Sequence, residues 1–235
     1  MTPEYTFAFQ PIVDMTTRAV VAYEALARGI NEEQAVQVLA GLSGGPLHLF
    51  DIEARRKAIN LAATLGIDCA LNLNLLPRSV DEFGEIAMAD TVEKAAEHGI
   101  PLKRIMLEVT ETETIANYAR FVKWAHQGRA LGVKFAIDDF GSGYSGLNLL
   151  AEFQPDAIKL DMMLVRDIST RGPRQAIVRG IIRTCDDLGI DIVAEGVETL
   201  DEYEWLLGEG INLFQGYLFA QPAFQALPKV NFPDF

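Results

Sequence analysis

The residues best suited to chemistry are two adjacent carboxylates, Asp138 and Asp139, which end an apolar run and precede a glycine-containing loop. The run 135–137 is typical of a buried strand, and Gly141 and Gly143 are typical of a tight turn into a helix. Two like charges this close repel each other unless one is protonated or a cation lies between them. The pair therefore indicates a cation site at a strand tip. The alternative is that Asp138 caps the next helix and Asp139 is solvated.

Polar side chains also end six other predicted strands. The runs AVVAY, ALNLN, RIMLE, AIK, DIVA and NLF end in or are followed by Glu24, Asn74, Glu108, Lys159, Glu195 and Gln215. A single polar strand end is unremarkable, because strand ends meet solvent. Together with Asp138, these residues match the rule that the chemistry of an α/β barrel takes place at the C-terminal ends of its strands.

Five of these strand-end residues offer oxygen ligands only: Glu24, Asn74, Glu108, Asp138 and Asp139. Carboxylate and amide oxygens without nitrogen or sulfur select a hard cation, so Mg²⁺ or Mn²⁺, or an inhibitory Ca²⁺, is favoured over zinc. The three histidines fall in helical or loop patterns, and we interpret them as surface or packing residues: His48, His98 and His126.

Four charged residues near these strand ends have two interpretations each. Lys159 is either a salt-bridge partner of the surrounding acids or a group that orients a metal-bound water. Glu195 and Glu198 flank Gly196, and one is a candidate ligand while the other braces the loop. Arg28, four residues after Glu24, is either solvated or a bidentate phosphate clamp.

Composition limits the classes of protein to be considered. The 235 residues fit one large domain or two small ones, and 49% hydrophobic residues suffice for a sizeable core. The net charge of −13 argues against a generic DNA or membrane-surface binder. A phosphate ligand would have to be met by metal ions or by a few local basic residues.

The chain shows no targeting or membrane signal. We see no signal peptide at the N-terminus and no apolar run of the roughly 20 residues that span a bilayer. Cys69 and Cys185 stand far apart in apolar patterns, so we expect reduced core thiols in a cytoplasmic protein.

The predicted elements form a repeating order. A hairpin of strands 5–14 and 19–26 precedes helices 32–42 and 47–65. Six strand-then-helix units follow, with strands at 69–75, 104–109, 133–138, 157–160, 191–194 and 212–214. The helices between them are expected up to about 99 and at 115–131, 144–152, 174–188 and 201–207. Near-continuous apolar strands indicate a parallel sheet buried on both faces, and the repeat favours a closed barrel.

Seven motifs in order resemble the EAL-domain family, whose members hydrolyse cyclic di-GMP. They are QPIVD at 10–14, YEALARG at 23–29, LEVTE at 107–111, DDFGSGYSGL at 138–147, IKLD at 158–161, VAEGVET at 193–199 and QGYLFAQP at 215–222. The resemblance covers nearly the whole chain. It implies one EAL-type domain over 1–235 with a TIM-like (β/α)8 barrel and one antiparallel strand near the N-terminus. We expect the tail after about 222 to be loosely attached.

The resemblance also implies roles for individual residues. The metal ligands would be Glu24, Asn74, Glu108 and Asp138, with Asp139 completing a second metal position. Lys159 and Glu195 would act around the nucleophilic water, and Gln215 would hold the water network or the metal environment. Gln10 and Arg28 would contact the dinucleotide. Glu111 would brace the loop 140–145, which in the family links dimerisation to metal binding, and Glu198 would support that loop.

The departures from the family pattern are mild. Ala27 stands where leucine is usual, Gly29 where a bulky residue is frequent, and Ser142 and Gly146 where threonine and serine are common. The motif NLNLLP lacks the usual serine after the asparagine. Asn74 keeps the distance to the proline, but Asn72 shares its strand face, so both stay candidates for the ligand. These changes affect substrate affinity and loop behaviour, and none removes a ligand.

The sequence thus predicts a metal-dependent phosphodiesterase that opens cyclic di-GMP to linear pGpG at a two-metal Mg²⁺ or Mn²⁺ site. It is expected to form a homodimer and to work with sensory or partner domains. The first alternative is a non-catalytic cyclic di-GMP receptor or protein-interaction module, which loss of a ligand would favour. The second is a barrel enzyme of enolisation chemistry, which shares the acids but not the ordered motifs.

Overall fold

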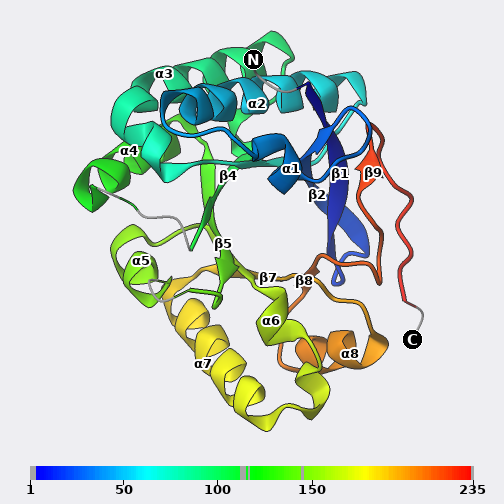
Figure 1. Cartoon of the computed structure of the whole chain (residues 1–235). Coiled ribbons are helices and arrows are strands. Elements are labelled where there is room, and N and C mark those ends of the chain that lie inside the picture. The colour runs from blue at the N-terminus through cyan, green and yellow to red at the C-terminus, as the bar shows by residue number, and fades with distance from the viewer. Residues whose placement is uncertain (1–3, 112–114, 116, 144–145, 234–235) are drawn as a thin grey trace.

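Eight strands close into a barrel in the computed structural model, which describes residues 4–111, 115, 117–143 and 146–233 (Figure 1). They are β1 (Tyr5–Asp14), β2 (Ala19–Gly29), β3 (Ala70–Asn74), β4 (Ile105–Thr110), β5 (Lys134–Phe140), β6 (Ala157–Leu160), β7 (Asp191–Ala194) and β8 (Leu213–Phe214). Strands β2 to β8 run parallel in sequence order, and β1 closes the ring antiparallel to both β2 and β8. The predicted barrel with one antiparallel strand is confirmed.

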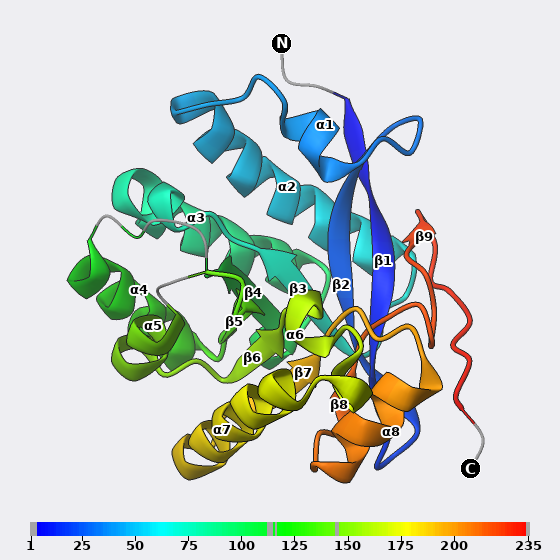
Figure 2. The same cartoon turned by 60° about the horizontal axis from the view of Figure 1, so that its bottom comes forward.

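α-Helices surround the barrel (Figure 2). The chain also contains two short 3₁₀ helices, which the sequence did not predict. The α-helices are α1 (Ala35–Leu39), α2 (Gly45–Thr64), α3 (Pro77–Glu97), α4 (Tyr118–Leu131), α5 (Gly146–Phe153), α6 (Met162–Val165), α7 (Gly172–Leu188) and α8 (Leu200–Gly208). Short 3₁₀ helices occupy Leu102–Arg104 and Ile168–Thr170. Among the described residues, no helix combines the length and the apolar character needed to cross a membrane.

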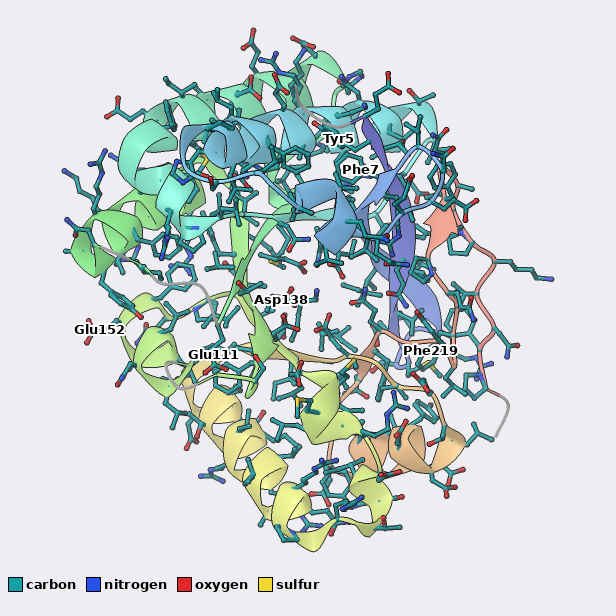
Figure 3. The ribbon with its side chains drawn as sticks, in the orientation of Figure 1. Tyr5, Phe7, Glu111, Asp138, Glu152 and Phe219 are labelled. Carbon is teal, nitrogen blue, oxygen red and sulfur yellow. The ribbon has the colours of Figure 1, made fainter. Side chains whose placement is uncertain are left out.

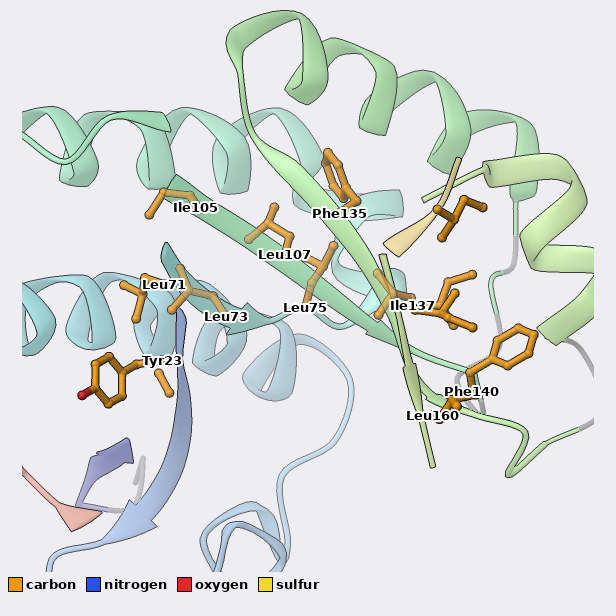
Figure 4. Packing of buried hydrophobic residues seen from close by; sticks show 14 of the residues in the cluster. Tyr23, Leu71, Leu73, Leu75, Ile105, Leu107, Phe135, Ile137, Phe140 and Leu160 are labelled. Carbon is orange, nitrogen blue, oxygen red and sulfur yellow. The ribbon is translucent and has the colours of Figure 1, made fainter. Parts of the chain in front are cut away.

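The outer face of the strands holds the main core. Every second residue of β3, β4 and β5 is buried against the helices. Figure 4 shows this for Leu71, Leu73, Leu107, Phe135 and Ile137. Successive strand residues point to opposite faces, so the residues between them face the barrel interior. Burial of the outer face therefore fixes which side chains line the inside.

The inner face changes from apolar to polar along the strand direction. Ile12, Ala22 and Val193 form a separate apolar cluster, with Ala70 and Leu213 packed against it. Two residues further along each of these chain segments lies a polar layer. It contains Glu24 of β2, Asn72 of β3, Glu195 directly after β7 and Gln215 directly after β8. On the antiparallel β1 the order is reversed, from Ile12 to Gln10. The apolar layer closes one end of the barrel, and the polar layer lies at the C-terminal ends of the parallel strands.

Several boundaries differ from the sequence-based expectation. Helix α1 is shorter than 32–42 because Glu32 has a left-handed backbone (φ 68°) and Gln34 caps the helix start. Pro11 lies within β1, and a proline inside a strand is typical of an edge strand or a bulge. Strand β1 has neighbours on both sides, but its register with β2 shifts between Ile12 and Val13, so the bulge is present and the edge is not. The expected helix 144–152 starts at residues 144–145, which lie outside the described residues.

The tail after Pro222, expected to be loosely attached, is held at several points. Strand β9 (Ala223–Phe224) pairs with β1 outside the ring. The amide of Asn231 donates to the carbonyl of Phe219 at 2.9 Å, and Arg18 Nη1 donates to the carbonyl of Pro233 at 3.0 Å. The tail is therefore attached to β1, to Arg18 and to the segment after β8.

Candidate active site

The ammonium group of Lys159 lies at the centre of the polar layer. Its Nζ atom is 3.0 Å from Glu24, 3.1 Å from Glu108, 3.0 Å from Asp138 and 2.7 Å from Glu195. The Lys159 side chain is 1% exposed, and that of Glu108 is fully buried. Strand β6 thus places one cation among four carboxylates, which come from β2, β4, β5 and the end of β7.

The charges of this cluster do not balance. Burial alone would lower the pKa of Lys159, but the carboxylates of Asp138, Glu108, Glu195 and Glu24 raise that pKa well above its ordinary value. Lys159 therefore stays protonated. The single positive charge of Lys159 does not neutralise the four carboxylates around it, so the cluster can bind further cations.

The pKa values of the acids reflect this excess of negative charge. Burial raises the pKa of Glu108 to about 8, even though Lys159 opposes the shift. Burial also raises the pKa of Glu195 well above its ordinary value. Burial and the neighbouring charge of Asp138 raise the pKa of Asp139 to about 6. Without a further cation, Glu108 holds a proton near neutral pH, and Asp139 holds one in weakly acidic solution.

Hydrogen bonds from asparagine and glutamine side chains orient the carboxylates of the cluster. Asn72 Nδ2 donates to Glu108 at 2.7 Å, and Gln215 Nε2 donates to Glu24 at 2.8 Å and to Gln10 Oε1 at 3.2 Å. The Nε2 of Gln10 donates to the carbonyl of Ala220 at 3.1 Å. Asn74 Nδ2 lies 3.5 Å from Glu24, the longest of these contacts. The carboxylates are therefore held in defined orientations.

The donor set fits two divalent cations. Glu24, Glu108 and Asp138 form one group of carboxylates within 4.8 Å of one another, and Asp138, Asp139 and Glu195 form a second. Asp138 belongs to both groups. Two buried amide oxygens of this layer, Asn72 Oδ1 and Gln215 Oε1, accept no hydrogen bond from the described residues, whereas Asp138 Oδ1 contacts the Lys159 ammonium. An unpaired acceptor oxygen is the type of atom that a cation would satisfy.

The loop after the paired acids is tied to Glu111. The Glu111 carboxylate accepts hydrogen bonds from the amides of Gly141 at 2.6 Å and Gly146 at 2.7 Å. Asp139 has a left-handed backbone (φ 53°), a conformation that side chains other than glycine rarely adopt. Figure 3 shows Asp138 inside the ring and Glu111 towards α5. Of the expected loop 140–145, residues 144–145 lie outside the described part.

A cavity of about 690 Å³ opens beside the cluster. Its acidic side includes Glu24, Asn74, Asp138, Asp139 and Glu195, and its other side is formed by apolar residues of β2, α1 and α2. This volume is typical of sites for small organic ligands. Of the two asparagine candidates, Asn74 lines the cavity, whereas Asn72 is buried behind Glu108.

Two predicted site residues lie apart from the cluster. Arg28 is not among the described residues that line the cavity, and its Nη1 donates to the carbonyl of Ala27 at 2.8 Å. Glu198 lines the cavity and forms an ion pair with Arg166 at 2.7 Å, at the end of α6, so its support of the loop after β5 stays a prediction. Asp161, at the end of the IKLD motif, also lines the cavity, and the sequence did not single it out. Its position two residues after Lys159, at the end of the same strand, was the available signal.

Comparison with known proteins decides the family. Residues 2–222 match the family described as EAL domain. The chain belongs to the EAL-domain family. This EAL domain superposes on a standalone versatile EAL protein from Vibrio cholerae in its c-di-GMP-bound form with a TM-score of 0.92, 43% identity and coverage of 98% of this chain and 97% of that one. It also matches the manganese/cy-diGMP complex of Klebsiella pneumoniae BlrP1, with a TM-score of 0.88, 43% identity and coverage of 94% and 56%.

Curated relatives of this EAL domain carry two kinds of name. The blue light- and temperature-regulated antirepressor BluF of Escherichia coli is 33% identical over 97% of this chain and 57% of its own length. The cyclic di-GMP phosphodiesterase RocR of Pseudomonas aeruginosa is 34% identical over 74% of this chain and 43% of its own length. The chain therefore spans about half the length of these relatives.

Proposed function

We propose that this EAL domain is a metal-dependent phosphodiesterase that hydrolyses cyclic di-GMP to linear pGpG. The observation that carries the proposal is the pair of carboxylate groups that share Asp138, beside a cavity of about 690 Å³. Relatives named cyclic di-GMP phosphodiesterases and structures with bound c-di-GMP support the substrate. The ligands are oxygens, so Mg²⁺ or Mn²⁺ is the proposed cofactor.

The roles of the chain's own residues follow from the cluster. Glu24, Asn74, Glu108 and Asp138 would hold one cation, and Asp138, Asp139 and Glu195 a second. When bound, the two cations supply a water of lowered pKa and positive charge beside the phosphate. Lys159 stays protonated, so it orients that water as a hydrogen-bond donor and does not remove its proton.

Glu195 is the group placed to accept that proton. Its carboxylate lies 2.7 Å from Lys159 Nζ, lines the cavity and keeps 15% of its side chain exposed. A general base must lie within hydrogen-bond reach of the proton it accepts, and these contacts place Glu195 beside the group that orients the water. Gln215 keeps Glu24 in position, and Gln10, which lines the cavity, is placed to contact the dinucleotide. Arg28 could contact it only after a change of side-chain conformation.

A non-catalytic receptor or interaction module is the second candidate, because BluF is named an antirepressor. Loss of a ligand would favour this candidate. Each proposed ligand position is filled by a residue with an oxygen donor, which favours the enzyme. The enolisation alternative is not supported by the family. A homodimer, partner domains beyond this segment and a cytoplasmic location are further parts of the proposal.

One assay tests the proposal directly. Purified protein is incubated with cyclic di-GMP and Mg²⁺, Mn²⁺ or excess EDTA, and the products are separated by chromatography. We expect linear pGpG with either metal and none with EDTA. Binding of cyclic di-GMP without any product in the presence of Mn²⁺ would instead identify a receptor.

A further inference from the structure

A buried ion pair on α2 has no part in the proposed mechanism. Asp51 and Arg55 are one helical turn apart, and Arg55 Nη1 lies 2.6 Å from Asp51 Oδ2. Their side chains are only 5% and 3% exposed. Both residues line the cavity, on its apolar side. A charged pair in such a place loses its hydration, so it is seldom more stabilising than apolar side chains of similar size.

The pair contacts the backbone at a candidate metal ligand and two residues after it. Arg55 Nη1 donates to the carbonyl of Asn74 at 3.3 Å. Asp51 Oδ1 accepts a hydrogen bond from the amide of Leu76 at 3.1 Å. Between these two contacts, the amide of Leu75 donates to the carbonyl of Glu108 at 2.8 Å. The backbone that leaves β3 is thereby fixed by α2 and by β4.

Asn74 depends on such support more than the other ligands do. It is the last residue of β3, and its side chain makes one long contact, 3.5 Å from Glu24. The other ligands of the first group are held more closely, since Glu24 and Glu108 each contact Lys159 at about 3 Å. The orientation of the Asn74 carboxamide is therefore set by the backbone at residues 74–76.

We propose that Asp51 and Arg55 act as positioning residues that hold Asn74 in the conformation that binds the divalent cation. The inference rests on the proposed function only in requiring that the site binds a cation. Groups that orient metal ligands typically change metal affinity by about 10- to 100-fold when they are removed. The pair would exert this effect without touching the metal.

The test is a calorimetric Mn²⁺ titration without nucleotide. In the double variant Asp51→Leu/Arg55→Met both charges are removed together, so no unpaired charge stays buried. We expect its dissociation constant for Mn²⁺ to rise about 10- to 100-fold. Arg56→Met is the matched control: Arg56 is the next residue of α2 and pairs with Asp90, away from the cavity. Its Mn²⁺ affinity should be unchanged.

A mutant cycle separates positioning from a general loss of stability. In an Asn74→Ala background, the double substitution should weaken Mn²⁺ binding no further, because the positioned ligand is already missing. Equal losses with and without Asn74 would overturn the proposal. If the double variant does not fold, Arg55→Lys keeps a positive charge beside Asp51 on a shorter side chain. We expect this change to weaken the contact with the carbonyl of Asn74 and to cost about 10-fold in Mn²⁺ affinity. Unchanged affinity in a folded variant would also refute the positioning role.

The outcome is distinct from that of the proposed function. If the wild-type protein does not bind Mn²⁺, the proposed metal site is refuted. If the wild-type protein and the variants bind Mn²⁺ equally well, only the positioning role of Asp51 and Arg55 is refuted.

Discussion

Lys159 Nζ lies 2.7 Å from Glu195 Oε1, the shortest of its four contacts with carboxylates. This ammonium has two possible roles, as a salt-bridge partner of the acids or as a donor to the attacking water. Both roles use the same contacts, so they are distinguished by substitution.

Replacement of Lys159 should separate rate from binding. We expect Lys159→Met to lower kcat by about 10²-fold or more, which is typical of the loss of a preorganised hydrogen-bond donor. The Kd for cyclic di-GMP should change little, because the cavity side chains are unaltered. Steady-state kinetics and equilibrium binding in Ca²⁺ measure the two quantities. A normal kcat would leave Lys159 a salt-bridge partner only.

The oxygen ligands should determine which metal ions support turnover. We expect turnover with Mg²⁺ or Mn²⁺ and inhibition by Ca²⁺, which prefers more ligands at longer distances. Product formation is measured with each metal after dialysis against EDTA, and Mn²⁺ is then added back as the control. Full turnover in excess EDTA would contradict the two-metal mechanism.

The polar layer could be predicted from the sequence, since it depends only on strand alternation and on the position of strand ends in a barrel. The convergence on Lys159 could not, because it depends on strand register: Lys159 lies opposite Val193 and Asn74 opposite Glu108 only once the ring has closed. Similarly, the spacing of Asp51 and Arg55 is that of an ordinary exposed helical pair, and only the packing of α2 over the end of β3 buries them.

The tail illustrates a different limit of sequence analysis. Strand β9 has two residues, and its pairing with Ala8 and Phe9 leaves no periodic pattern to detect. Proline residues at 228 and 233 suggested loose attachment. Hydrogen bonds to the distant residues Arg18 and Phe219 hold the segment instead.

Without metal, stability should fall as pH rises. The folded-state pKa values of Glu108, about 8, and Asp139, about 6, lie above their ordinary values. The folded protein therefore binds more protons than the unfolded chain between about pH 4 and 8, and its free energy of unfolding decreases across that range. Lys159 stays charged throughout and adds no slope in this range. In EDTA we expect a lower melting temperature at pH 8 than at pH 5.5.

Added Mn²⁺ should reverse this trend, because deprotonated carboxylates bind the cation more tightly. The increase in melting temperature on addition of Mn²⁺ should be larger at pH 8 than at pH 5.5. Glu108→Gln is the control in EDTA, since it removes one of the titrating groups and should reduce the decline. A metal-free melting temperature that rises from pH 5.5 to 8 would contradict the raised pKa values.

The last prediction concerns Glu111, which joins the end of β4 to the loop after β5. Both of its carboxylate oxygens accept backbone hydrogen bonds, from Gly141 and from Gly146, while its own amide donates to the carbonyl of Asp138 at 3.0 Å. Glu111→Ala removes the first two contacts and keeps the third. We expect weaker Mn²⁺ binding and lower turnover, because Asp138 and Asp139 begin the loop that loses its support.

The barrel should stay folded in this variant, since the side chain lies at a strand end and the core residues are unchanged. Glu111→Gln retains one acceptor oxygen and should fall between wild type and Glu111→Ala. Melting temperature, dimer fraction and turnover are measured together on all three proteins. Unchanged turnover in Glu111→Ala would refute the brace, and a collapsed melting temperature would show that Glu111 supports the fold. A parallel loss of dimer and turnover would place the loop at the proposed homodimer surface, because one change would then disturb both.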